Sequence, residues 1–442
     1  MSNEEILNRI QNSNGVSIDT RTLDKGNIFF ALKGDNFDGN KFVDIAIEKG
    51  ADLIICSDNK YIDKKDVVVV KNALTSLQEL AKLYRKRFKI PIIAITGTNG
   101  KTTTKELLCT ILSGKFNVLC TKGNFNNHIG VPLTLFGLKP NHQIAVIEMG
   151  ASSLGEIEFL CNIAEPNYGT ITSIGTAHIL GFGSFENIIR TKMELFDYLK
   201  QNDGLFFYNE VIKDLSEIIN KDDCSLGFDN TSLQGEAIES IELKKTYPFI
   251  SLTIDLINKN KIYVETKLYG RYNFNNIITA VKIADYFGIE PAIIKEQLEG
   301  YFPKNNRSQI LDWNTNKIIL DAYNANPTSM MEALKSFVEI DTVKDKILVL
   351  GDMLELGDVS LVEHRRIIDF VIKENSFKKI VLVGSEFINA YKASRIKSEI
   401  INLFENSTKA KSEILSMNLK KSLVLAKGSR GIKIESIFGS IQ

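Results

Sequence analysis

The chain has 442 residues, of which 44% are hydrophobic and 24% charged, a composition typical of soluble globular proteins with several domains. Lysine plus arginine and aspartate plus glutamate number 54 each, so the charge balance does not indicate binding to nucleic acid or to an anionic membrane. The five cysteines lack CxxC spacing, and no apolar run resembles a signal peptide or a membrane span. We therefore expect a cytoplasmic protein with free thiols and no membrane insertion.

Short apolar runs alternate with stretches of helical periodicity along almost the whole chain, which is typical of α/β units with mainly parallel sheets. Polar or basic linkers divide the chain into three predicted domains, residues 1–88, 89–303 and 304–442. The first is a small α/β domain, with strands expected at 28–32, 52–56 and 67–70 and a helix at about 73–88. The third is Rossmann-like, with strands expected at 317–321, 346–352, 379–384 and 422–428.

The middle domain is predicted to open with a phosphate loop, formed by the strand PIIAIT, the turn GTNG and a helix from about Lys101. The usual spacing G-x-x-x-x-G-K-[ST] would place a glycine where this chain has Ile95. The order of strand, glycine turn and helix is nevertheless the context that such a loop requires. Backbone N–H groups from Gly97 to Thr103 would face phosphate oxygens, Lys101 would reach the outer phosphates and Thr102 would bind Mg²⁺. The alternative is a plain glycine turn before a helix with an exposed lysine.

Two further predicted strands of the middle domain end in groups that suit a metal or phosphate site. The run QIAVIEMG delivers Glu148, which either binds a metal ion or caps the following helix. The run GTITSIG is followed at once by His178, and a lone histidine in a loop is often only structural. Because ligands of open α/β sheets bind at the carboxyl ends of the strands, three such ends in one domain favour a functional site.

Lys192 lies on the apolar face of the predicted helix FENIIRTKMELFDYLK, four residues from both Ile188 and Phe196. A buried ammonium is costly unless it is paired or neutralised. The side chain could therefore reach solvent from the edge of the apolar stripe, or it could carry out chemistry or be modified.

The segment TKGNFNNHIGVPLTLF, residues 121–136, holds three asparagines, a histidine and two glycines, and its first half is too polar for a core. It is either a loop that faces a substrate or a plain connection between elements.

Together these motifs resemble the Mur ligase family, the ATP-dependent amide-bond ligases of bacterial cell-wall synthesis, and the resemblance covers nearly the whole chain. In that family the phosphate loop reads T-G-[TS]-[NS]-G-K-[TS], which residues 96–102 match at every position. The chain also matches the family's N-x-N-N-x-x-G loop, its E-M-G-[AS] strand end, its segment ending in G-x-A-H and its G-x-x-N-x-x-N-x-x-x-A helix start. In the last of these, Asn273 could alternatively be a helix N-cap.

The resemblance implies an ATP-dependent ligase with two Mg²⁺ ions, in which Lys101, Glu148, His178 and Lys192 are catalytic. Thr102 and Glu148 would hold one ion, and His178 with Lys192 the other. In the family the lysine at the Lys192 position is carbamylated, which turns an ammonium into a carboxylate. The residues implied to bind ATP are Gly97, Thr98, Asn99, Gly100, Lys101, Thr102, Thr103, Asn276, Arg307 and Asp321.

The segments DAYNANPTSM and LGDMLELG resemble those of the family members that join D-alanyl-D-alanine to UDP-N-acetylmuramoyl-tripeptide. The first domain resembles the family's UDP-binding domain, although Lys25 and Lys41 replace a common proline and histidine. The residues implied to bind substrate are Ser17, Thr20, Arg21, Asn126, Asn127, Asn324, Asn326 and Asp352. A monomer without a nucleic-acid partner is expected, and a folylpolyglutamate-synthase-like ligase or a non-catalytic nucleotide-binding scaffold are the alternatives.

Overall fold

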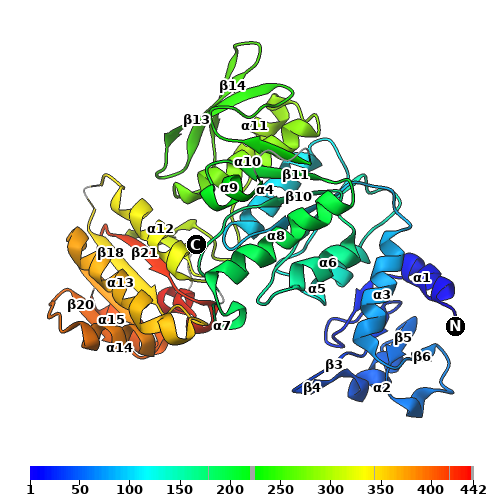
Figure 1. Cartoon of the computed structure of the whole chain (residues 1–442). Coiled ribbons are helices and arrows are strands. Elements are labelled where there is room, and N and C mark those ends of the chain that lie inside the picture. Colours follow the sequence, from blue (N-terminus) through cyan, green and yellow to red (C-terminus); the bar gives the residue numbers. More distant parts are fainter. Residues whose placement is uncertain (178, 220–223, 343, 418, 440–442) are drawn as a thin grey trace.

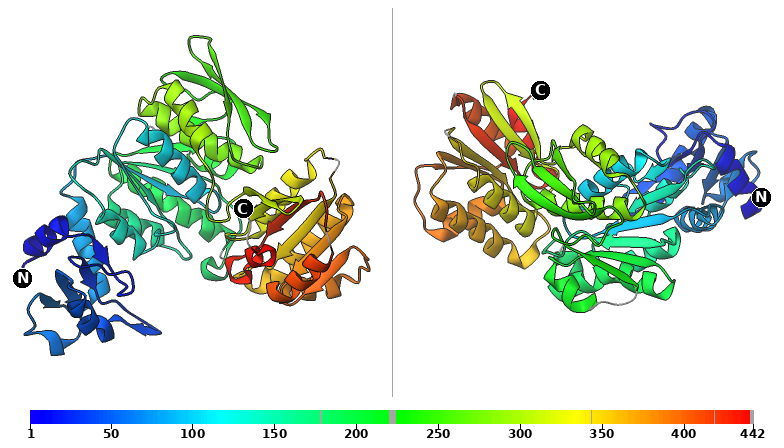
Figure 2. Two further views of the ribbon diagram at one scale, coloured as in Figure 1. Left: turned by 180° about the vertical axis from the view of Figure 1, so that it is seen from behind. Right: turned by 90° about the horizontal axis from the view of Figure 1, so that it is seen from above.

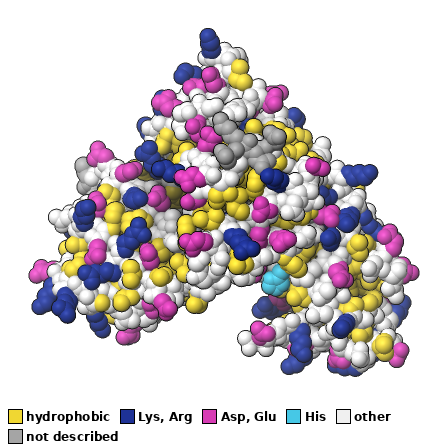
Figure 3. All heavy atoms as spheres, in the orientation of Figure 1, with side chains coloured by type: hydrophobic (Ala, Val, Ile, Leu, Met, Phe, Trp, Pro, Cys, Tyr) yellow, Lys and Arg dark blue, Asp and Glu magenta, His cyan; other side chains and the backbone are white. Residues whose placement is uncertain are grey.

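The computed structural model of the chain describes residues 1–177, 179–219, 224–342, 344–417 and 419–439. Three α/β domains lie in a row, with the N-terminal and C-terminal domains on different sides of the central one (Figure 1), and the views in Figure 2 show the same arrangement. Figure 3 shows basic and acidic side chains interspersed over one face, in keeping with the balanced composition. None of the described helices is long and apolar enough to cross a membrane.

The N-terminal domain is built on a four-stranded parallel sheet in the order β1-β2-β5-β6. Three of these strands and the helix α3 were predicted, and all four are present, although each of them is shorter than expected. The elements are α1 (Asn3–Asn12), β1 (Val16–Ser17), β2 (Ile28–Phe30), the hairpin β3 (Lys33–Gly34) and β4 (Phe37–Asp38), α2 (Val43–Glu48), β5 (Leu53–Cys56), β6 (Val67–Val69) and α3 (Ala73–Arg85).

The central domain contains a six-stranded, all-parallel sheet in the order β12-β11-β10-β7-β9-β8. Its strands are β7 (Ile92–Thr96), β8 (Val118–Cys120), β9 (Ile144–Glu148), β10 (Tyr168–Ile171), β11 (Leu205–Asn209) and β12 (Ser225–Phe228). Since β7 lies between β9 and β10, the carboxyl ends of these three strands meet at one edge of the sheet.

Alternate residues of β7 supply the two faces of this sheet, as strand geometry requires. Ile93 and Ile95 pack with α4 (Lys101–Ser113), α10 (Tyr272–Tyr286) and α11 (Pro291–Gly300). Ile92 and Ala94 pack with α5 (Gly130–Leu135), α6 (Glu156–Ala164) and α8 (Phe185–Gln201). The core on this second face continues without interruption into the N-terminal domain.

Aromatic contacts show how closely the first two domains are joined. Phe30 of β2 stacks on Phe136, just after α5, with ring centroids 6.0 Å apart. Tyr84 of α3 also contacts Phe136 and donates a hydrogen bond of 3.0 Å to the Leu138 carbonyl. The interface between these domains is therefore largely apolar.

A three-stranded antiparallel sheet, which the sequence reading did not anticipate, extends the central domain (Figure 1). It consists of β13 (Ile238–Lys245), β14 (Ser251–Leu256) and β15 (Lys261–Glu265). The central strand β14 is buried from Ser251 to Ile254. In the outer strands β13 and β15, Ile241 and Val264 join the core beside α10, while their neighbours are partly or fully exposed. Such half-buried strands lack the continuous apolar runs by which the parallel strands were found.

The expectation of five free thiols was wrong, because Cys109 of α4 and Cys120 of β8 form a disulfide. The expectation rested on the lack of motif spacing, but consecutive helix and strand units pack side by side, which brings these two Cα atoms to 6.4 Å. Cys56 and Cys161 are buried free thiols.

The C-terminal domain has a six-stranded sheet in the order β16-β17-β21-β18-β19-β20, in which only β16 runs antiparallel. Helices α12 (Pro327–Val338), α13 (Ser360–Glu374) and α14 (Ser385–Ser394) cover one face, while α15 (Ser407–Ser416) covers the other. The four strands predicted here are present as β17, β18, β19 and β21. The strand bounds are β16 (Gln309–Trp313), β17 (Asn316–Asp321), β18 (Lys346–Gly351), β19 (Lys379–Val383), β20 (Ile401–Phe404) and β21 (Leu423–Lys427).

Candidate active site

The phosphate loop, residues 97–100, connects β7 to α4 and depends on its two glycines. Gly97 and Gly100 have φ values of 139° and 83°, in the region that disfavours other residues. A Cβ at Gly97 would lie 2.3 Å from Thr172 Oγ1, and a Cβ at Gly100 would lie 2.3 Å from Asn276 Oδ1. Helix α4 begins without a side-chain cap, so its first N–H groups suit an anion.

Replacing Gly100 by alanine should therefore destabilise the loop. The added methyl group meets Asn276 at a positive φ, and we expect a cost of about 2–4 kcal/mol from strain and overpacking together. Thermal unfolding and ATP affinity of Gly100→Ala would measure it, with Gly300→Ala as control, because Gly300 has open space around it and no positive φ. An unchanged melting temperature together with unchanged ATP affinity would contradict this account of the loop.

The tip of the loop is held by hydroxyl groups that the sequence reading missed. The Asn99 N–H donates to Ser173 Oγ at 2.8 Å. Its carbonyl accepts from Thr172 Oγ1 at 2.6 Å and from Ser173 Oγ at 3.0 Å. The signal was present, since two hydroxyl residues follow the last apolar residue of β10.

Lys101 folds back onto its own loop. Its ammonium donates to the Gly97 carbonyl at 2.5 Å and to the Thr98 carbonyl at 3.1 Å. Burial lowers the pKa of Lys101, and the Glu148 carboxylate partly opposes this effect. The Lys101 ammonium thus already lies beside the phosphate loop, where the negative charge of a bound phosphate would stabilise it.

Glu148 ends β9 and is only 1% exposed. Its Oε1 accepts hydrogen bonds from Thr102 Oγ1 at 3.1 Å and from Asn126 Nδ2 at 2.8 Å. Its Oε2 is buried and has no hydrogen-bond partner among the described residues. A buried carboxylate oxygen without a donor is costly, and a hard cation held with Thr102 would satisfy it. The residues present therefore fit the Mg²⁺ site expected for Thr102 and Glu148.

Lys192 lies on the inward face of α8 and is 2% exposed, which excludes the alternative in which its side chain reaches solvent. Burial lowers the pKa of Lys192 to about 7, and the positive charge of Lys101 contributes to the shift. Its Nζ lies 5.4 Å from the centre of the Phe182 ring. His178, the residue expected to share a metal ion with Lys192, lies outside the described residues.

Asn276 of α10 lies directly beneath the phosphate loop. Its Oδ1 accepts from Thr104 Oγ1 at 3.2 Å, and its Nδ2 donates to Asn273 Oδ1 at 2.9 Å. The alternative of Asn273 as a helix N-cap is wrong, because Arg271 holds the N-cap position of α10 and the Asn273 side chain donates to the Tyr269 carbonyl.

On the C-terminal domain, two predicted ATP-binding residues lie near the start and end of the hairpin β16–β17. Asp321, which is partly exposed, forms an ion pair of 2.6 Å with the buried Lys427 and accepts from the Ser308 N–H at 3.2 Å. The Arg307 guanidinium stacks on the Tyr323 ring at 3.5 Å, and its Nε has no hydrogen-bond partner among the described residues. The Tyr323 ring thus fixes the orientation of the Arg307 guanidinium, and N–H donors of this group remain available for a ligand.

Asp352 was expected to face a substrate, but in the structure its carboxylate accepts hydrogen bonds from the start of α14. It is 2% exposed and accepts from the Glu386 and Phe387 N–H groups, both at 2.9 Å. These are the N–H groups of the second and third residues of α14, which has no side-chain cap at its N-cap residue, so Asp352 satisfies them from the end of β18.

The four predicted asparagines make different contacts. Asn126 holds Glu148, as described above, whereas Asn127 Oδ1 accepts from the Ile129 and Gly130 N–H groups and so starts α5. Asn324 is exposed and its Oδ1 accepts from the Ala325 N–H. Asn326 caps α12 and contacts Asn99.

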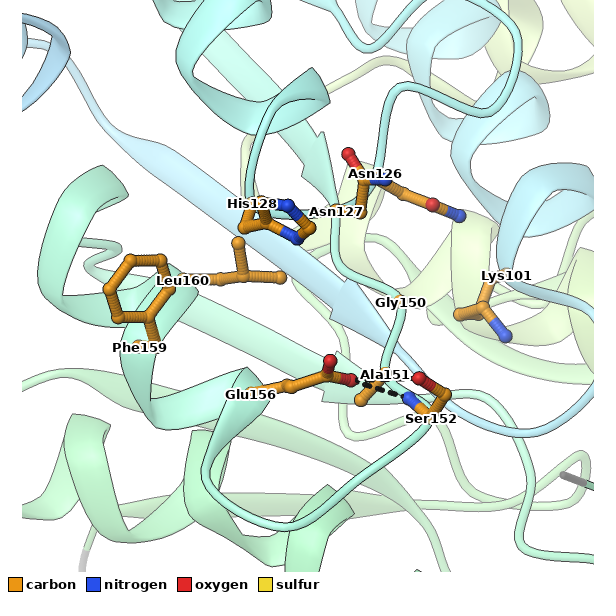
Figure 4. Close-up of a pocket in the computed structure, with 10 residues that line it drawn as sticks. All are labelled: Lys101, Asn126, Asn127, His128, Gly150, Ala151, Ser152, Glu156, Phe159 and Leu160. Carbon is orange, nitrogen blue, oxygen red and sulfur yellow. Dashed lines mark hydrogen bonds between the residues drawn. The ribbon is translucent and has the colours of Figure 1, made fainter. Parts of the chain in front are cut away.

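A pocket of about 300 Å³ opens beside Lys101 (Figure 4). Asn126, Asn127 and His128 line one side, and Ser152 and Glu156, joined by a hydrogen bond of 2.5 Å, line the other. Phe159 and Leu160 add an apolar wall, so the pocket suits a ligand with both polar and apolar parts.

Ser17, Thr20 and Arg21 gather in one turn of the N-terminal domain. Arg21 pairs with Asp19 at 2.6 Å and is exposed, and the Thr20 carbonyl accepts from Lys49 Nζ at 2.7 Å. The Ser17 hydroxyl donates to the Asp19 carbonyl within the same turn.

Comparison with known proteins defines the class to which this fold and site belong. Three Mur ligase models match consecutive parts of the chain: the Mur ligase family catalytic domain at residues 12–96, the middle domain at 95–284 and the glutamate ligase domain at 306–430. The chain belongs to the Mur ligase family.

Within this family, the similarity extends over entire chains. The UDP-N-acetylmuramoyl-tripeptide–D-alanyl-D-alanine ligase of Bacillus subtilis (strain 168) is 33% identical over 96% of this chain and 92% of its own. The crystal structure of MurF from Acinetobacter baumannii is 28% identical, with a TM-score of 0.82 over 98% of this chain and 97% of that one. The structure of MurF ligase from Thermotoga maritima in complex with ADP is 25% identical, with a TM-score of 0.81 over 97% and 96%.

Proposed function

We propose that this chain is an ATP-dependent ligase that joins D-alanyl-D-alanine to UDP-N-acetylmuramoyl-tripeptide during peptidoglycan synthesis. The observation that carries the proposal is the full-length match to ligases of that name, combined with a phosphate loop, Lys101 and Glu148 at one edge of the central sheet. Because both ATP and the UDP-linked tripeptide are nucleotides, we propose that the reaction takes place in the cytoplasm, and we propose that the chain acts as a monomer.

ATP would lie between the central and C-terminal domains. The free N–H groups at the start of α4 and the Lys101 ammonium support binding of its phosphates at residues 97–103. Arg307, stacked on Tyr323, and Asp321 support contacts from the C-terminal side. Asn276 has its amide engaged beneath the loop, so we assign it the added task of holding Gly100 in place.

The unsatisfied oxygen of Glu148 and the neighbouring Thr102 would hold Mg²⁺. Mg²⁺ would supply charge neutralisation on the transferred phosphoryl group. Lys192, with its pKa lowered to about 7, has a large neutral fraction near neutral pH, and the neutral amine is the form that adds CO₂ to give a carbamate. We propose this modification, together with His178, for the second ion.

We propose the following order of events. The terminal carboxylate of the tripeptide would attack the γ-phosphorus of ATP, so that ADP leaves and an acyl phosphate forms. The amine of D-alanyl-D-alanine would then attack the acyl carbon, and phosphate leaves as the amide forms. Lys101 and the N–H groups at the start of α4 would balance the developing charge in the first step, since the Thr98 and Asn99 N–H groups already donate to Ser173. Domain closure would keep water from the acyl phosphate.

We propose positions for the substrates from the pocket, the turn and the loop described above. The pocket beside Asn126, Asn127 and Lys101 would take the tripeptide end, and the turn at Ser17, Thr20 and Arg21 the uridine diphosphate. Asn324, exposed in the loop after β17, would meet the incoming dipeptide. Asp352 would shape this region only indirectly, by fixing α14.

One assay tests the proposal against both alternatives. ADP release should require UDP-N-acetylmuramoyl-tripeptide and D-alanyl-D-alanine together, and a coupled spectrophotometric assay with each substrate omitted in turn measures this requirement. Release with a folate substrate and glutamate would indicate a folylpolyglutamate-synthase-like ligase. ATP binding without release under any of these conditions would indicate a non-catalytic scaffold.

A further inference from the structure

The tip of the phosphate loop is in direct contact with the C-terminal domain. Asn326 Nδ2 donates to Asn99 Oδ1 at 2.8 Å, and Asn99 Nδ2 donates in return to Asn326 Oδ1 at 3.4 Å. These residues are 227 positions apart and belong to different domains. The amide pair therefore forms only when the two domains are together.

Each of the two asparagines is held by hydrogen bonds within its own domain. Asn326 is 8% exposed and caps α12, where its Oδ1 accepts from the Ser329 N–H at 2.9 Å and its N–H donates to Ser329 Oγ at 3.1 Å. Asn99 has its backbone N–H and carbonyl bound by Thr172 and Ser173. The Asn326 side chain is thus fixed by its cap and the Asn99 side chain by its backbone position, so the pair accepts a narrow range of relative domain positions.

A second contact beside the pair supports the same docked position. Thr328 Oγ1 lies 3.3 Å from both the N–H and the Oγ1 of Thr176, in the loop after β10. A Cβ at Gly175 would lie 2.9 Å from Thr328 Oγ1, so the backbone approaches as closely as a glycine allows. The first turn of α12 thus rests on the two loops that border the phosphate site.

We propose that Asn326 is a positioning residue that fixes the docked C-terminal domain on the phosphate loop through Asn99. This inference rests on the proposed function, because docking matters for a reaction whose acyl phosphate must be kept from water. Asn326 holds the loop tip in place, and the sequence resemblance had implied only a substrate contact for it. Loss of the pair leaves the chemistry intact but allows water to reach the intermediate.

The variant Asn326→Ser separates this role from helix capping. Serine is as good an N-cap as asparagine, but it has no Nδ2 to reach Asn99. The matched control is Asn406→Ser, which makes the same change at the cap of α15, where Asn406 Oδ1 accepts from the Lys409 N–H at 3.0 Å. Thermal unfolding of both variants shows whether each remains folded.

The measured quantity is the amount of ADP released per amide bond formed, with saturating substrates. Wild type and Asn406→Ser should release equal amounts of ADP and amide product. In Asn326→Ser we expect excess ADP and a rise of about two- to tenfold in the KM for D-alanyl-D-alanine, the range that one net hydrogen bond supports. Equal ADP and amide in a folded Asn326→Ser, with an unchanged KM, would overturn the inference.

The partner residue supplies an independent test. The phosphate-loop pattern of the family allows serine in place of Asn99. The variant Asn99→Ser should therefore reproduce the excess ADP of Asn326→Ser. The double variant should be no worse than either single variant, because both remove one contact. Additive effects would show that the two residues act separately. If the wild-type protein formed no amide at all, the proposed function itself would be refuted. This outcome can be told apart from a failure of the inference about Asn326, in which the wild-type protein forms amide.

Discussion

Replacing Lys101 by alanine should abolish ATP-dependent turnover while the fold remains intact. The ammonium lies at the mouth of the phosphate loop, bonded to the Gly97 and Thr98 carbonyls, where it can transfer to phosphate oxygens. Removing one preorganised charge from such a site costs about 10²- to 10³-fold in kcat, and more when it also orients the phosphates. The rate of ADP release at saturating substrates measures the effect.

The fold of Lys101→Ala should be preserved, because the hydrogen bonds of the side chain within the described part of the structure go to its own loop. Circular dichroism and thermal unfolding would check this, and Lys373→Ala, an exposed change on α13, serves as the control for activity. Full turnover by Lys101→Ala would show that residues 97–103 are not the phosphate site.

Lys192→Ala should lose most activity, with partial recovery when a small carboxylate such as acetate is added. The substitution removes the amine proposed to carry the carbamate, and acetate would restore an anionic oxygen in the space left beside Phe182. We expect a loss of about 10²-fold or more, as for removal of other groups that stabilise charge in the transition state. Initial rates across an acetate titration would measure both effects.

The pH dependence gives a second readout for Lys192. Because its pKa is lowered to about 7, the amine becomes protonated as the pH falls through 7, and a protonated amine cannot form a carbamate. Wild-type activity should therefore fall below pH 7, and the acetate-restored variant should lack this limb of the profile. Lys200→Ala, an exposed change on the same helix, should behave as wild type. A wild-type rate in Lys192→Ala would refute the metal-binding role.

The parallel strands and the phosphate loop could be predicted because their signals are local. A continuous apolar run that ends in Glu148 or Asp321 is a buried strand with a polar end, and GTNGKT places the loop between strand and helix. The sequence also predicted that Lys192 faces inward, from its four-residue spacing to Ile188 and Phe196, and it is buried.

What the sequence did not reveal depends on distant contacts. Cys109 pairs with Cys120 because a helix and the following strand pack together, and Asp352 turns away from solvent because α14 lacks a cap of its own. Asn126 was predicted to meet substrate, yet its amide already holds Glu148, an arrangement set by where β9 ends relative to the loop. Such partners are chosen by the tertiary fold, and no spacing along the chain encodes them.

The continuous apolar core between the first two domains has a thermodynamic consequence. Residues from α1, β2 and α3 share one core with β7, β9 and α8, so loss of either domain would expose apolar surface of the other. The C-terminal domain has cores almost entirely its own and meets the phosphate loop through polar side chains such as Asn326. We therefore expect the first two domains to unfold as one cooperative unit and the C-terminal domain to unfold as a second unit.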